Sequence, residues 1–228
     1  MAGPSLQQDL REIAALQGRL PGASAVLIGA VAAGVVFFPT VWTVSRYLYT
    51  LAHEGGHAVM GWAVGHKVSS ITMEWNGNGL TKTTGQPGMG VFLFQFFGFL
   101  APSAIGLAAA KLIEVGHIIA VLWLVLAALA ALLVIARGLV AWTCIAGAGL
   151  LLYLTARHAP LGMQIVLAYA ITWFLLISGV ASVVRSSRAP GGDPDLLRKT
   201  THLPRGLWPP LWLLGSALAL IAGARLLV

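Results

Sequence analysis

Two histidines and a glutamate lie close together in the first quarter of the chain, in the run His53-Glu54-Gly55-Gly56-His57. In a helix, residues four positions apart share a face, so His53 and His57 can direct ring nitrogens at one metal ion. Glu54, one step round the helix, can hold a water molecule beside that ion and take a proton from it. The spacing predicts metal-dependent peptide hydrolysis, with His53 and His57 as ligands of Zn²⁺ and Glu54 as the catalytic general base.

The apolar surroundings of this run strengthen the prediction. Residues 40–64 are rich in Leu, Ala, Val and Trp, and polar groups in such a segment are costly unless they pair or bind something. The alternative is a buried polar network without a metal. Gly55 and Gly56 each weaken a helix by up to about 1 kcal/mol relative to alanine. They serve either close helix packing or the approach of an extended peptide to the metal, and the residues alone favour neither.

Composition places the chain in a membrane. Of the 228 residues, 58% are hydrophobic and 9% are charged, with a mean hydropathy of +0.85, whereas soluble domains carry about 25% charged residues. The net charge of +7 is scattered between apolar segments, so it indicates loops that face an anionic bilayer surface rather than nucleic-acid binding. The single cysteine, Cys144, excludes an internal disulfide.

The elements that must position the motif are predicted to be membrane helices. Apolar segments long enough to cross a bilayer follow one another at 22–38, 40–64, 90–112, 117–136, 139–155, 162–184 and 207–226. They predict an all-α polytopic membrane protein of about six to seven transmembrane helices. Pro39 separates the first two segments, which form either a tight hairpin or one kinked helix; we favour the hairpin.

Three polar segments lie outside these helices. Residues 1–21 place apolar side chains at helical spacing between polar ones, which predicts a short amphipathic helix on the membrane surface rather than a cleavable signal peptide. Residues 22–228 then form a single transmembrane domain. Within it, residues 65–89 alternate in polarity around Asn76-Gly77-Asn78-Gly79 and predict a polar β-hairpin, and residues 185–206 form a long polar loop.

The distribution of basic residues predicts the orientation in the membrane. If seven segments cross and the N-terminus is cytoplasmic, ten basic residues lie on the cytoplasmic side and four on the other: Arg11, Arg19, Lys67, Lys82, Arg137, Arg185, Arg188, Arg198, Lys199 and Arg205 against Arg46, Lys111, Arg157 and Arg225. This arrangement puts the 65–89 hairpin and the 185–206 loop together on the cytoplasmic side of the cell's plasma membrane.

A catalytic zinc ion usually has three protein ligands, so a third ligand must come from elsewhere in the chain. Of the seven acidic residues, Asp9 and Glu12 lie in the amphipathic segment, Glu114 falls at the opposite membrane face, and Glu74 occupies a solvated position in the hairpin. Asp193 and Asp195 remain, in the loop on the hairpin's side, and elimination leaves both open.

Several motifs together resemble those of the site-2 protease family of intramembrane zinc metallopeptidases, in its small bacterial branch without a PDZ domain. They are Leu51-Ala52-His53-Glu54-Gly55-Gly56-His57-Ala58, Gly98-Phe99-Leu100-Ala101-Pro102, Gly192-Asp193-Pro194-Asp195, Thr201-His202-Leu203-Pro204, and Trp208 in the last span. The first matches closely and the others loosely, since the aspartate loop reads Gly-Asp-Pro where the family has a Ser-Asp-Ala-like motif.

The resemblance implies site residues by position. His53 and His57 correspond to metal ligands, Glu54 to the general base, and Asp193 to the third ligand, with Asp195 as the alternate. Pro194 should hold Asp193 in an extended conformation, so that both aspartates project to the same side. If Asp195 does not bind the metal, it should cap a helix that begins near Leu196.

The function predicted from these residues is zinc-dependent cleavage of a transmembrane segment in a membrane-protein substrate. The edge of the 65–89 hairpin could hold that substrate as an added strand. The first alternative is a non-catalytic metal-binding or scaffold subunit of a larger complex or homo-oligomer; retention of Glu54 argues against it. The second is an ion transporter, for which no inverted repeat is visible in the sequence.

Overall fold

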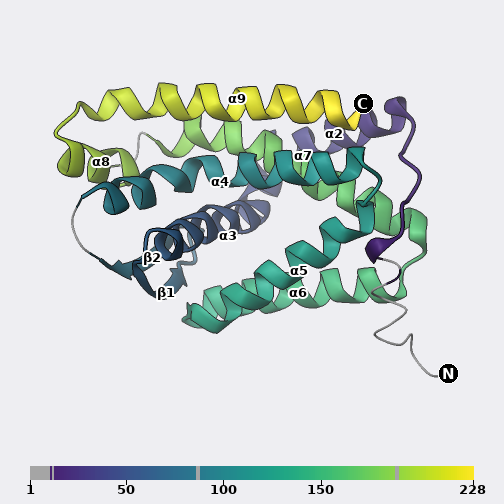
Figure 1. Ribbon diagram of the computed structural model, residues 1–228, viewed down its shortest axis with the longest axis horizontal. Coiled ribbons are helices and arrows are strands. Elements are labelled where there is room, and N and C mark those ends of the chain that lie inside the picture. The colour runs from purple at the N-terminus through teal and green to yellow at the C-terminus, as the bar shows by residue number, and fades with distance from the viewer. Residues whose placement is uncertain (1–10, 12, 86–87, 188–189) are drawn as a thin grey trace.

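Long apolar helices form the frame of the computed structural model, which describes residues 11, 13–85, 88–187 and 190–228 (Figure 1). In chain order they are α2 (Gly22–Phe37), α3 (Pro39–Ala63), α4 (Met89–Glu114), α5 (Ile118–Ile135), α6 (Leu139–His158), α7 (Leu161–Ser186), the short α8 (Asp193–Thr201) and α9 (Trp208–Leu227). A 3₁₀ turn, Arg205–Leu207, leads into α9. The prediction of an all-α polytopic membrane protein is confirmed.

Among the described residues, the helices α4, α5, α6, α7 and α9 are each long and apolar enough to cross a bilayer. Helices α2 and α3 pass that test only as a pair, which is bent by 99° at Phe38. The pair is therefore neither a tight hairpin nor a single kinked helix, and the hairpin that we favoured is wrong. Pro39, at the first position of α3, restricts Phe38 to an extended conformation (φ −79°, ψ 115°) that turns the chain between the two helices.

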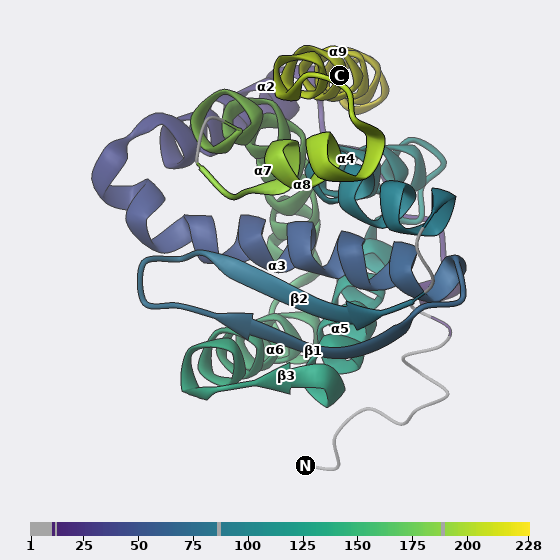
Figure 2. The same cartoon turned by 90° about the vertical axis from the view of Figure 1, so that its left-hand side faces the viewer.

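The helix that carries the histidines lies across the others. In Figure 1, α4, α7 and α9 run along the long axis of the molecule, whereas Figure 2 shows α9 end-on and α3 lengthwise. Helix α3 thus crosses the bundle at a steep angle, packed against the middle of α4, and does not return along it. Up to six spans result, with α2 and α3 counted as one, so the topology with seven crossings does not hold.

The predicted hairpin is confirmed. Strand β1 (Lys67–Met73) pairs antiparallel with β2 (Gly79–Thr84), and the turn places Gly77 at φ +80°, a conformation that favours glycine. A short strand that the sequence did not reveal, β3 (Ala136–Arg137) between α5 and α6, pairs in parallel with Ile71 and Thr72. The strand order is β2-β1-β3, so β2 is an edge strand, and α3 lies beside it (Figure 2).

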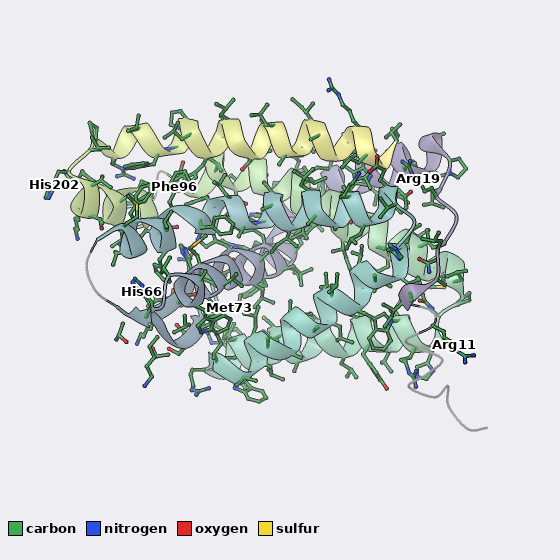
Figure 3. The ribbon with its side chains drawn as sticks, viewed as in Figure 1. Arg11, Arg19, His66, Met73, Phe96 and His202 are labelled. Atoms are coloured by element: carbon green, nitrogen blue, oxygen red, sulfur yellow. The ribbon has the colours of Figure 1, made fainter. Side chains whose placement is uncertain are left out.

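The described part of the N-terminal segment, residue 11 and residues 13–21, lies at the end of the molecule away from the hairpin. Figure 3 labels Arg11 and Arg19 at one end and His66 and His202 at the other, and the Arg19 side chain donates to the carbonyl of Leu226 in α9 (2.5 Å). This arrangement differs from the predicted one, which put the segment and the hairpin on one side, because α2 runs along the bundle once and α3 does not run back; the side of the membrane stays a prediction. The predicted amphipathic helix also ends early, since residues 15–21 are not helical; residues 1–10 and 12 lie outside the described residues.

The predicted 185–206 loop contains a helix, α8, whose position is fixed by an aromatic cluster. Leu197 is fully buried and packs in one cluster with Phe99 of α4 and with Trp208 and Trp212 of α9. Thr200 adds a hydrogen bond to Gln95 of α4 (2.8 Å). These contacts hold the first turn of α8 over α3, where the two histidines lie.

Candidate metal centre

Three side chains from two elements converge beside α3. His53 and His57 project from α3 and Asp193 from the start of α8, and one ligand atom from each residue lies within 4.8 Å of the others. The Nε2 atoms of the two histidines are 3.2 Å apart. Asp193 Oδ2 is 3.2 Å from Nε2 of His53 and 3.4 Å from Nε2 of His57. The three atoms form a nearly equilateral triangle.

The size of this triangle fits a zinc ion. Tetrahedral zinc binds histidine nitrogen and carboxylate oxygen at about 2.0–2.2 Å, which separates neighbouring ligand atoms by about 3.3–3.5 Å. The three distances, 3.2, 3.2 and 3.4 Å, are those of one tetrahedral face. A fourth position would then be left for water or substrate, as in catalytic zinc sites.

The environment of His57 directs its Nε2 atom toward this triangle. Its Nδ1 lies 2.6 Å from the carbonyl oxygen of Phe94 in α4, an acceptor, so we assign the ring proton to Nδ1. The Nε2 lone pair then faces Asp193. Gly98 makes this approach possible, because a Cβ there would fall 2.3 Å from Nε2 of His57. A lone pair facing a carboxylate is repulsive unless a proton or a metal ion lies between them, and a metal bound to both groups would remove the repulsion.

His53 is held by ring contacts. Its Nδ1 is 3.4 Å from the Tyr49 hydroxyl one turn earlier, and its ring stands edge-on to Phe99 with centroids 4.9 Å apart. Phe99 in turn stacks on Trp212 (4.5 Å), part of the cluster that fixes α8. The aromatic cluster therefore connects His53 to the helix that carries Asp193.

Asp193 occupies the first position of α8, after the N-cap Gly192. Burial opposes ionisation of its carboxyl, but with no metal bound the positive charge and hydrogen bonds of protonated imidazoles at His57 and His53 outweigh that effect and hold its pKa below the ordinary value. The carboxylate is thus available as an anionic ligand. The predicted extended conformation of Asp193 is wrong, because Pro194 occupies the first turn of α8, where its fixed φ suits a helix.

Asp195 points away from the two histidines. Its Oδ2 accepts a hydrogen bond from the backbone N–H of Gly191 (2.8 Å) and lies 3.4 Å from the guanidinium of Arg205. The two aspartates do not project to the same side, since in the first turn of a helix residues two apart diverge. The predicted capping role is wrong, because Asp195 is the third residue of α8 and no side chain caps that helix; its carboxylate instead ties Gly191, before the N-cap, to the first turn.

Glu54 lies under the hairpin. It is 4% exposed, and its carboxylate accepts a hydrogen bond from the hydroxyl of Thr81 in β2 (2.6 Å). Thr81 and the backbone carbonyl of Phe94 are site groups that sequence reasoning missed. The alternation of Gly79, Thr81 and Thr83 along β2 indicates one shared face, but not that this face meets Glu54.

The two glycines of the motif differ in their surroundings. A Cβ at Gly56 would fall 2.1 Å from Cβ of Ala101 in α4, whereas one at Gly55 would meet only Leu132, at 3.4 Å. Close packing of α3 on α4 thus accounts for Gly56 but leaves Gly55 unexplained. Glu74, set aside on sequence grounds, lies in the exposed turn of the hairpin and bonds Asn76.

Comparison with known families agrees with this geometry. Residues 26–223 match the family model described as Peptidase M50B-like. Searches of curated proteins and of solved structures return no match. The matched region contains all three converging side chains, Glu54 and the whole hairpin.

Proposed function

Since the chain belongs to the M50B-like peptidase family over residues 26–223, we propose that it is an intramembrane zinc endopeptidase. Its substrate would be a membrane protein, cleaved within a transmembrane segment. The observation that carries this proposal is the triangle of His53, His57 and Asp193 ligand atoms, with edges of 3.2–3.4 Å, in a chain whose helices are apolar enough to cross a bilayer.

Each residue of the site has a distinct role in this proposal. His53, His57 and Asp193 hold the zinc ion. The ion, when bound, would activate a water molecule and polarise the carbonyl group of the scissile peptide bond. Glu54 accepts a proton from the attacking water and passes it to the amide nitrogen of the leaving chain. As the new carbon–oxygen bond forms, the peptide carbon–nitrogen bond breaks and leaves a carboxyl and an amino terminus.

The sheet supports a place for the substrate. Strand β2 is an edge strand without a second partner strand among the described residues, and it lies between β1 and α3. A transmembrane helix must unwind before a protease can reach its backbone, and an unwound segment can pair with a free strand edge. The edge of β2 would hold such a segment beside Glu54.

The proposal is tested by zinc analysis and cleavage on purified protein. We expect about one zinc per chain in the wild type and none in His53→Ala or His57→Ala, because two remaining ligands bind zinc weakly. Glu54→Gln should keep the metal and lose hydrolysis of a single-span reporter, since glutamine cannot accept the proton. Zinc retained in His53→Ala would contradict the metal site.

Cleavage that persists in Glu54→Gln would contradict the enzymatic role of Glu54 even if zinc is present. A wild type that binds zinc but fails to cleave any reporter, in cells and in detergent, would instead favour a metal-binding scaffold subunit. The two readouts therefore separate an enzyme from a binding protein that has the same fold.

A further inference from the structure

Strand β2 of the hairpin contacts the proposed general base directly. The Thr81 hydroxyl lies 2.6 Å from Oε2 of Glu54 and 3.1 Å from the backbone carbonyl of the same residue. A hydroxyl has one proton to donate, and the charged, nearer oxygen is the stronger acceptor. Thr81 is 7% and Glu54 4% exposed, so water competes little for this hydrogen bond.

Gly79, on the same face of β2, makes room for the carboxylate. A Cβ there would fall 2.6 Å from Cγ and 2.7 Å from Oε1 of Glu54. Gly79 does not have a positive φ, unlike Gly77 in the turn, so its backbone does not require glycine. The close approach of Glu54 does, because its carboxylate packs against the Gly79 backbone.

The hairpin is also attached to α3 along a single line of side chains that ends at Glu54. Three further hydrogen bonds join α3 to the turn of the hairpin: Arg46 to Asn78 (3.2 Å), Tyr47 to the carbonyl of Trp75 (2.5 Å) and Thr50 to the carbonyl of Gly77 (2.8 Å). Positions 46, 50 and 54 recur at one-turn spacing. The position of the carboxylate is therefore tied to the position of the hairpin.

We propose that Thr81 is a positioning residue for Glu54, and that β2 holds the general base in place at the same edge where the substrate strand binds. The Thr81 hydroxyl fixes Oε2, and the absence of a side chain at Gly79 lets the carboxylate lie against β2 in that position. Docking of the hairpin on α3 thereby aligns the base with the peptide bond. This inference rests on the proposed function and names a residue that acts through Glu54.

Steady-state cleavage of a fluorogenic single-span peptide in detergent tests the role of the hydroxyl. Thr81→Val should lower kcat about 10-fold or more, as expected for a misplaced catalytic group, and leave KM and zinc content near the wild-type values. Thr81→Ser, which restores the hydroxyl, should recover most of kcat. Thr83→Val is the matched control, because Thr83 lies on the same face of β2 but bonds the carbonyl of Lys67 (3.3 Å).

The steady-state results can overturn the inference in two ways. An unchanged kcat in Thr81→Val, or a Thr81→Ser variant as slow as Thr81→Val, would show that the hydroxyl does not position the base. A rise in KM without a fall in kcat would assign Thr81 to substrate binding instead.

Hydrogen exchange of the zinc-free protein tests the contact without any activity. Both Thr81→Val and Glu54→Ala should speed amide exchange in peptides covering residues 79–84, because either change removes the same hydrogen bond between hairpin and helix. In Thr83→Val, exchange in these peptides should be slower than in those two variants. If exchange is faster in both variants but the wild type cleaves nothing, the contact between Thr81 and Glu54 would be supported although the proposed function had failed. Unchanged exchange in both variants would overturn the contact itself.

Discussion

At the scale of single residues, the two aspartates of α8 have different roles: Asp193 in metal binding and Asp195 in stability. Asp193 faces both histidines, and Asp195 bonds the Gly191 N–H and pairs with Arg205. Asp193→Ala should lower zinc affinity by about 100-fold or more, beyond the losses seen for residues that only orient ligands, and abolish cleavage. Metal titration of the purified variant checks this.

Asp195→Ala is the matched control for that prediction. It should keep zinc and lose about 1 kcal/mol of stability with the hydrogen bond to Gly191, which lowers the melting temperature in detergent by about 2–4 °C. The partly exposed pair with Arg205 adds little. If Asp195→Ala released the metal and Asp193→Ala retained it, the third ligand would be wrongly assigned.

Pattern alone predicts only those site residues that lie close together in the sequence. His53, Glu54 and His57 lie within five positions, so helical periodicity places them together. Asp193 is far away in the chain, and elimination could not separate it from Asp195, because the choice depends on where α8 begins. Thr81 carries no local signal, since its role arises only when β2 docks on α3.

At the scale of elements, the packing of α3 on α4 predicts opposite effects for the two motif glycines. Gly56→Ala puts a methyl group 2.1 Å from Cβ of Ala101; such overpacking typically costs about 1–3 kcal/mol. It should also push away the α4 segment that holds His57, with loss of zinc. Gly55→Ala meets only ordinary contact with Leu132 and should gain up to about 1 kcal/mol of helix stability.

Thermal unfolding and zinc content of the two alanine variants measure these effects. Equal tolerance of both substitutions would show that close packing of α3 and α4 is not needed. A Gly55→Ala protein that is stable and zinc-loaded but inactive would instead indicate that Gly55 leaves room for the substrate backbone, one of the two roles that the sequence left open.

At the scale of the whole molecule, the sequence predicts the helices and the hairpin but not how α3 is directed. Apolar length identifies residues 40–64 as a helix, and the helix found at Pro39–Ala63 agrees closely. Length and composition do not tell whether a helix runs along the other membrane helices or lies steeply across them. That direction depends on the 99° bend at Phe38 and on the hydrogen bonds between α3 and the hairpin. The predicted side of the N-terminus depended on the number of crossings, which was counted as seven with residues 40–64 as a separate crossing.

The fold therefore places the described basic residues differently from a topology with seven crossings. Eight lie at the end with the hairpin and α8, and five at the other end: Arg46, Lys67, Lys82, Arg137, Arg185, Arg198, Lys199 and Arg205 against Arg11, Arg19, Lys111, Arg157 and Arg225. From the excess of positive charge we predict that the hairpin end lies in the cytoplasm and that residues 13–21 lie at the opposite face of the membrane.

Cysteine labelling tests this topology. In a Cys144→Ala background, Lys82→Cys and Arg198→Cys lie exposed at the hairpin end, and Leu16→Cys is exposed at the other end. A membrane-impermeant maleimide added to intact cells should label Leu16→Cys alone, and inverted vesicles should give the reverse pattern. Labelling of Leu16→Cys and Lys82→Cys from the same side would show that α2 does not cross the membrane. In that case the bend at Phe38 would belong to a re-entrant segment, and the proposed site would open on the same side as the N-terminus.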